Sequence, residues 1–189
     1  MKKSNLRLLA FFLFLVLAQN SLAATHQDGT GSEAASDETV AVGLSYTDGK
    51  GVTHKNIAGN PAKPGEKYYA TAIGIANTAN KKFSSAFGYL NTATGESSSA
   101  FGYNNTASGY SSSAFGRMNK AKEESSSAFG YLNEASGKWS NAFGSLYKVT
   151  GEASGAFGVG EVYDYVHYNH KYINEGKNSY MFGNYNKIA

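Results

Sequence analysis

The sequence predicts an all-β fold, a parallel β-roll or solenoid of 14-residue coils stacked on one another. Two observations predict it: an Ala-Ile/Phe-Gly tripeptide that recurs every 14 residues, and the Gly, Ser and Asn residues that separate its copies. Composition is the third, because 189 residues with 22 Gly and few Leu or Ile cannot fill a large aliphatic core. One short coil cannot bury a face alone, so the copies must stack.

The tripeptide defines the regular part of the chain. It ends at Gly74, Gly88, Gly102, Gly116, Gly130, Gly144 and Gly158. In most copies Ser stands four residues before this Gly, Asn stands three residues after it and Ala stands five residues after it. A further copy that contains Gly183 is offset, because Gly158 and Gly183 are 25 residues apart, one period plus 11.

A helical interpretation of the period is disfavoured by glycine. Four repeats carry a second Gly, and two Gly in 14 residues cost a helix about 2 kcal/mol relative to Ala. Two strands of about four or five residues and two tight turns use the same length. Stacked coils would then pair each strand in parallel with its copy in the next coil.

Alternation along the motif strand separates two faces. Side chains of successive strand residues point to opposite sides, so the aromatic residue opposes its Ala and Gly neighbours. One face should fill the roll and the other should meet a second copy of the chain, but the pattern does not decide which. The ladder expected in the roll core or the subunit interface consists of Ile73, Phe87, Phe101, Phe115, Phe129, Phe143, Phe157 and Phe182.

The first 23 residues are predicted to be a secretory signal peptide. Three basic residues precede an apolar run at 8–18, and small residues follow at 21 and 23. Removing 1–23 takes three of the 17 basic residues and none of the 14 acidic ones, so the remaining chain has no net charge. This disfavours nucleic-acid binding driven by positive charge. No later apolar run reaches the roughly 18 residues that a membrane-spanning helix needs.

The rest of the chain divides by regularity. We expect a flexible acidic lead-in at 24–39, irregular first coils at 40–69, regular repeats at 70–160, a Tyr-rich insertion at 161–178 and one further repeat at 179–189.

The unit Ser-x-Ser-Ala-Phe-Gly-x-x-Asn-x-Ala-x-Gly, as in Ser97–Gly109, resembles the head repeat of the YadA-like trimeric autotransporter adhesins. The resemblance spans 70–160, includes 179–189 and extends loosely over 40–69. It implies a left-handed parallel β-roll, a homotrimer, and display on a Gram-negative outer membrane. It also implies a virulence-related role in cell adhesion: attachment to a host matrix protein, a cell-surface receptor or other bacteria.

The sequence departs from that family at its end. Family members continue into a neck, a coiled-coil stalk and a membrane anchor, whereas this sequence stops at Ala189 within a repeat. We therefore expect the front piece of a longer protein or a truncated, non-functional fragment. Cell-surface location is implied by the resemblance, while the export signal alone also fits a periplasmic or extracellular protein. A structural β-roll spacer is the alternative function, and the sequence does not identify a ligand.

Catalysis is disfavoured by the residue types. The chain has no Cys, the regular repeats hold no His, and their acidic residues fall in variable positions. We expect no enzymatic activity and no cofactor. His167 and His170 alone have a spacing seen among metal ligands, but alternation with Tyr163 and Tyr165 is more typical of a strand, so no metal site is predicted.

Tyrosines form the candidate ligand-contact surface, because Tyr offers rigid amphipathic contact area. They are Tyr89, Tyr103 and Tyr131 in an outer column, and Tyr163, Tyr165, Tyr168 and Tyr172 in the insertion. Arg117 interrupts the column, which fits stacking between coils as well as ligand binding. For the insertion, a packed excursion between coils is the favoured alternative.

Overall fold

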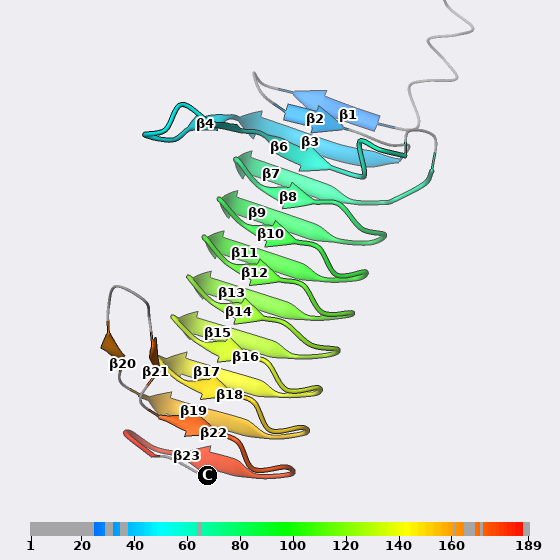
Figure 1. Cartoon of the computed structure of the whole chain (residues 1–189). Helices are drawn as coiled ribbons and strands as arrows, with labels where there is room; N and C mark the ends of the chain where they lie inside the picture. The colour runs from blue at the N-terminus through cyan, green and yellow to red at the C-terminus, as the bar shows by residue number, and fades with distance from the viewer. Residues whose placement is uncertain are drawn as a thin grey trace, which may run out of the picture.

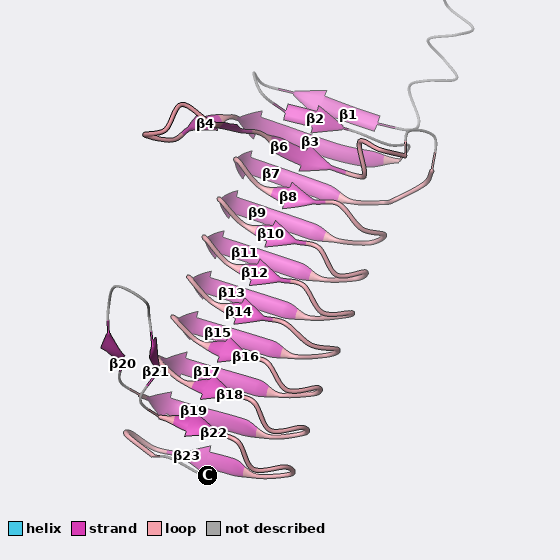
Figure 2. Ribbon diagram, in the orientation of Figure 1, coloured by secondary structure: helices cyan, strands magenta, loops and turns pink. Residues whose placement is uncertain are grey.

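The computed structural model describes residues 25–28, 32–34, 38–63, 66–160, 162–164, 169–170 and 172–186. Every regular element in these ranges is a β-strand, and the strands wind into a single parallel solenoid (Figures 1 and 2). The predicted all-β roll of 14-residue coils is confirmed.

Two parallel sheets run the length of the solenoid, and every described coil except the last, which has only β23, gives one strand to each sheet. Sheet A has ten strands, in the order β1 (Thr25–Asp28), β3 (Thr39–Leu44), β7 (Thr71–Ile75), β9 (Ser85–Tyr89), β11 (Ser99–Tyr103), β13 (Ser113–Arg117), β15 (Ser127–Tyr131), β17 (Asn141–Ser145), β19 (Gly155–Val159) and β23 (Tyr180–Phe182). Sheet B has nine, in the order β2 (Ser32–Ala34), β6 (Asn56–Ala58), β8 (Thr78–Ala79), β10 (Thr92–Ala93), β12 (Thr106–Ala107), β14 (Lys120–Ala121), β16 (Glu134–Ala135), β18 (Lys148–Val149) and β22 (Ile173–Asn174). In the regular coils the second strand is shorter than expected, two residues against five.

The register places each residue beside its own copy. Phe101 lies opposite Phe87 on one side and Phe115 on the other, and the same shift of 14 residues holds in sheet B. Identical side chains therefore form straight columns, and any column of the sequence repeat becomes a stripe on the roll.

Residues in the left-handed backbone region close both turns of each coil. In the regular part they recur every seven residues, from Ala76 and Phe83 to Leu146 and Ala153. Each such residue costs roughly 1–2 kcal/mol unless hydrogen bonding offsets the strain. Here its N–H continues the ladder around the turn: the Asn104 N–H donates to the Tyr89 carbonyl at 2.8 Å.

Alanine columns fill the interior. Ala86, Ala100 and their copies project from sheet A, Ala93, Ala107 and their copies project from sheet B, and all are fully buried. The choice that the sequence left open is thus decided, because the small Ala side chains fill the roll. The phenylalanines of the same strands point to the outside.

The segment 24–39, expected to be a flexible lead-in, contains two strands of the roll. Thr25 of β1 pairs with Thr39 of β3, 14 residues further on, and Ser32 of β2 pairs with Asn56 of β6. Backbone groups form the ladder whatever the side chains are, so a polar segment without the tripeptide can still add a rung. The sequence pattern therefore missed one coil.

Two antiparallel hairpins leave the roll at the turn that follows sheet A (Figure 1). One pairs β4 (Tyr46–Thr47) with β5 (Thr53–His54), and the other pairs β20 (Val162–Asp164) with β21 (Asn169–His170). The insertion expected at 161–178 is shorter than that, because Ile173 of β22 already pairs with Lys148 of sheet B. The further repeat expected at 179–189 contributes β23, with Phe182 opposite Phe157.

Candidate functional site

Buried asparagines hold the turn between the two sheets. They are Asn56, Asn77, Asn91, Asn105, Asn119 and Asn133. Asn105 Nδ2 donates to the Phe101 carbonyl of its own coil at 2.9 Å and to the Gly116 carbonyl of the next coil at 2.7 Å. Its Oδ1 accepts the Asn119 N–H at 3.0 Å. The amides thus satisfy backbone groups that the turn leaves unpaired and fix the outer edge of the roll.

A stack of phenylalanine rings runs along the outer face of sheet A. Centroids of successive rings from Phe87 to Phe182 lie 4.6 to 5.1 Å apart, and the rings are within 13° of parallel. Ile73 lies in register as the first rung. The rings up to Phe157 are half-buried, largely by one another, and Phe182 is 69% exposed. The ladder predicted from sequence therefore lies outside the alanine core.

A second column lies along the edge of the roll where the strands of sheet A end. We call it the edge column, and it consists of Tyr46, Tyr89, Tyr103, Arg117 and Tyr131. Tyr46 of the first hairpin packs edge-on against Tyr89 at 5.6 Å, and Tyr89 stacks on Tyr103 at 5.2 Å. The Arg117 guanidinium lies 5.6 Å from the Tyr103 ring and 5.4 Å from the Tyr131 ring. Arg117 therefore continues the stack that it interrupts in the sequence.

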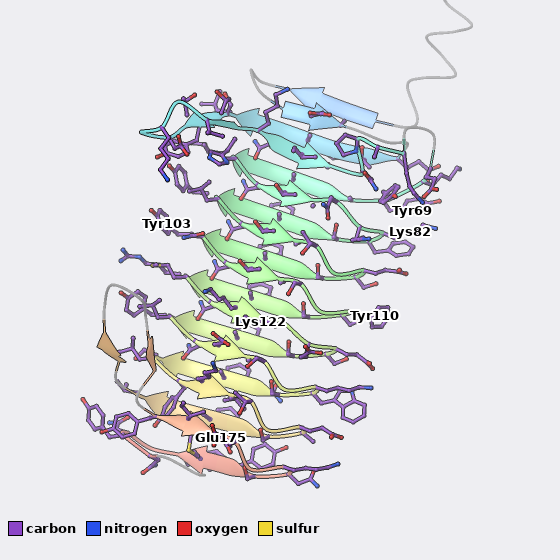
Figure 3. The ribbon with its side chains drawn as sticks, in the orientation of Figure 1. Tyr69, Lys82, Tyr103, Tyr110, Lys122 and Glu175 are labelled. Atoms are coloured by element: carbon purple, nitrogen blue, oxygen red, sulfur yellow. The ribbon has the colours of Figure 1, made fainter. Side chains whose placement is uncertain are left out.

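The edge column is open to solvent. Tyr103 is 45% exposed and Tyr131 36% exposed, and Figure 3 shows Tyr103 projecting from this edge. Partial burial and the nearby hydroxyls of Tyr46 and Tyr103 raise the pKa of Tyr89. Like other tyrosine hydroxyls, that of Tyr89 can both donate and accept a hydrogen bond.

Of the four insertion tyrosines predicted to contact a ligand, only Tyr172 has a side chain that the structure describes. Tyr165 and Tyr168 lie outside the described residues, and Tyr163 is described only as backbone in β20. Tyr172 is half-buried and packs against the alanine core, with its ring 5.7 Å from that of Tyr185. Tyr172 thus belongs to the packing of the roll.

The structure describes no metal site at His167 and His170. His167 lies outside the described residues, and His170 forms part of β21. Within the described ranges no three His, Cys, Asp or Glu side chains gather as metal ligands would.

The opposite edge carries aromatics that the sequence analysis missed. Tyr69 stacks on Phe83 at 5.3 Å, Lys138 Nζ lies 4.3 Å from the Trp139 ring centroid, and Tyr110 is 56% exposed. Figure 3 shows Tyr69 and Tyr110 on this side, away from Tyr103. Tyr69, Phe83 and Trp139 occupy a turn position where serine is the commoner residue. Tyr110 occupies the preceding position, where most other coils have Lys or Glu. Only a comparison of the positions just before the motif strand could have found them.

Charged side chains on sheet B gather around Glu134. Its Oε1 accepts a hydrogen bond from Lys122 Nζ at 2.9 Å and lies 3.4 Å from Lys148 Nζ, and its side chain is 13% exposed. Partial burial acts to raise the pKa of Glu134, but the Lys122 hydrogen bond and the Lys148 charge outweigh it and lower the pKa.

We expect this cluster to make stability depend on pH. A carboxyl whose pKa falls on folding stabilises the fold above its ordinary pKa of 4.5, and that contribution is lost as the pH falls through the lowered value. Glu134→Gln should therefore cost about 1 kcal/mol at pH 7, and the difference from wild type should vanish in acid. Urea unfolding at pH 7 and pH 3 measures it. Glu96→Gln, on an exposed turn, is the control and should change the free energy of unfolding at pH 7 by less than about 0.5 kcal/mol.

The comparisons with known proteins agree with this architecture. The family model described as the YadA head domain repeat matches two copies, at residues 66–91 and 93–117. No curated protein matches the chain. In the described ranges, no helix has the length and apolarity to cross a membrane. The match indicates an adhesin-type role, in a family that is typically non-enzymatic. The chain therefore carries two YadA head domain repeats, and their 14-residue register continues through the later strands of sheet A.

Proposed function

We propose that this chain forms the head of a surface-displayed, homotrimeric adhesin that attaches to host extracellular matrix, host cells or other bacteria. The observation that carries the proposal is the distribution of aromatic side chains. Alanine side chains fill most of the roll, while stacked rings lie on its outside, where they can contact other molecules. The two YadA head repeats support the same conclusion.

The phenylalanine stack supports self-association. It forms a straight apolar stripe on a flat sheet, and contiguous apolar stripes on soluble proteins mark interaction surfaces. A second copy offers an identical stripe with the same spacing, so the rings can interdigitate along the length of the roll. In a trimer each chain would turn its sheet A inward and keep its edges outward.

The edges then supply the contacts with other surfaces. Weak contacts become strong when three heads on one trimer, and many trimers on one cell, engage together. A structural spacer is the second candidate, and the rod-like repetition of identical coils favours it (Figure 1). The two differ in whether the purified chain binds anything.

The test is adhesion of the purified chain to immobilised matrix proteins and to cells, with its mass measured by light scattering. A trimer that binds would support the adhesin. A trimer that binds none of these surfaces would favour the spacer, and a folded monomer would overturn the homotrimer.

We expect the triple substitution of Phe101, Phe115 and Phe129 by Ser to abolish the trimer and leave the roll folded. The rings lie outside the core, and each stacked pair contributes about 0.5–1.5 kcal/mol beyond its buried area. Light scattering should give the monomer mass, and circular dichroism should keep its β signal. The matched control replaces Ser99, Ser113 and Ser127, which lie on the same face beside the rings, with Ala. A variant that remains trimeric would show that the stack is not the interface.

A further inference from the structure

We propose that the edge column binds a carboxylated glycan, with the Arg117 guanidinium on the sugar carboxylate and the tyrosine hydroxyls on sugar hydroxyls. This inference rests on the proposed adhesin function and names the chemistry of its ligand.

Arg117 is the centre of the site. The chain has one other arginine, Arg7, in the predicted signal peptide. Several lysines of the roll pair with glutamates, as Lys122 and Lys148 do with Glu134, whereas Lys120 of the same coil as Arg117 is an exposed cation without flanking rings. Arg117 is exposed and makes no ion pair within the described part of the chain. The guanidinium of Arg117 is thus available to bind a partner molecule.

The two flanking rings orient that fork. Tyr103 and Tyr131 cover the guanidinium from both sides at 5.6 and 5.4 Å. A guanidinium held between two rings keeps N–H groups that face solvent, because Arg117 is exposed. A planar fork held in this way matches the two oxygens of a carboxylate.

The stacked tyrosines suit sugar hydroxyls better than an apolar ligand. Tyr89 and Tyr103 face one another at 5.2 Å, so each ring covers a face of the other and presents its edge and hydroxyl outward. A tyrosine hydroxyl donates one hydrogen bond and accepts others, as sugar hydroxyls do. Repetition along the roll makes a row of such groups beside the cation.

Charge and topology narrow the ligand class further. One cation among four tyrosines suits a ligand with a single carboxylate, whereas a nucleic acid or a heavily sulfated chain requires several cations. A peptide would need a free strand edge or an apolar groove. Along this edge each regular strand is already paired on both sides, as β11 is with β9 and β13.

The site stays open in the proposed trimer. Figure 3 shows Tyr103 projecting from the edge of the roll, not across the flat sheet. Covering the phenylalanine stack with a neighbouring subunit therefore need not cover Arg117. Three edge columns would face outward, one from each subunit.

The experiment is a glycan array probed with the purified full chain. The array carries sialylated and uronic-acid glycans, their neutral counterparts, and a glutamate-rich peptide. We expect binding to carboxylated glycans, a loss of at least tenfold for Arg117→Gln, and an intermediate loss for Arg117→Lys, which keeps the charge and removes the fork. Lys120→Gln, an exposed cation of the same coil, is the matched control and should bind as wild type does.

Three outcomes would overturn the inference: no binding to any carboxylated glycan, equal binding of the neutral counterparts, or binding of the peptide alone. Sizing and circular dichroism of Arg117→Gln show that the roll is intact, as expected for an exposed residue. Adhesion to cells and matrix separates the two proposals. If wild type and Arg117→Gln adhere equally, the glycan site is wrong and the adhesin stands; if neither adheres, the adhesin itself fails.

Discussion

Gly116→Ala is expected to break the roll at its middle coil. Gly116 has φ of +113°, a conformation that L-residues with a side chain rarely adopt. A Cβ built there would lie against the Gly130 carbonyl oxygen, far inside van der Waals contact, and 3.1 Å from the carbonyl carbon. That carbonyl also accepts the Asn119 amide at 2.7 Å, so it cannot move without losing a buried hydrogen bond.

Strain and clash together should cost more than about 4 kcal/mol, a large fraction of the stability of a small domain. Urea unfolding followed by circular dichroism measures the loss. Gly49→Ala is the matched control, because Gly49 lies in an exposed hairpin turn where the added methyl group would have no other atom within 4 Å. It should change the free energy of unfolding by less than about 0.5 kcal/mol. Equal losses at the two positions would contradict the close packing of the motif glycines.

The fold class could be predicted because a parallel stack copies every residue onto itself. A period of 14, with Ala, Phe and Gly in fixed positions, gives sheet A its register directly. The face that fills the roll could not be predicted, since Phe and Ala alternate with equal regularity. The decision is one of volume: the space between two sheets joined by such tight turns suits methyl groups, and a ring such as that of Tyr147 is buried only where the repeat has lost its Asn and Ala.

The roles of single residues were less predictable, for two reasons. Asn105 stood out as part of a column, but its role depends on which carbonyls a turn leaves unpaired, and this is a property of the fold. From the sequence, Arg117 interrupts the tyrosine column, because a comparison of residue types separates a charged residue from aromatic ones. In the structure its planar guanidinium takes the place of a ring between Tyr103 and Tyr131. The strands at 25–28 and 32–34 lack the tripeptide, and only Thr25 and Ala34 lie opposite an identical residue in the next coil.

Asn105→Leu is expected to cause the other large loss of stability. The change keeps the size of the side chain and removes its amide, so the carbonyls of Phe101 and Gly116 and the N–H of Asn119 lose their partner. Each buried group left unsatisfied costs about 1–3 kcal/mol. We expect a total loss of about 3–6 kcal/mol, measured by urea unfolding, with faster hydrogen exchange at the Asn119 amide.

The neighbouring asparagine gives the control. Asn104 is exposed, has φ of 53° and closes the same turn. Asn104→Gly keeps that backbone conformation without strain and removes an amide that faces solvent, so its effect should stay within about 0.5 kcal/mol. If Asn105→Leu were as mild as this control, the asparagine ladder would not hold the coils together.

Asn105→Asp separates the hydrogen bonds from the shape of the side chain. At pH 7 its carboxylate would face the Phe101 and Gly116 carbonyls with no hydrogen to donate, in a position that is fully buried. Folding should therefore raise the pKa of this carboxyl, so stability is highest below its ordinary pKa of about 3.9 and falls as the pH rises. Urea unfolding should show the variant recovering towards wild type in acid, where a protonated carboxyl can donate one of the two hydrogen bonds. Asn105→Leu should show no such recovery, so the acid recovery of Asn105→Asp measures what a donated hydrogen bond contributes at this buried position.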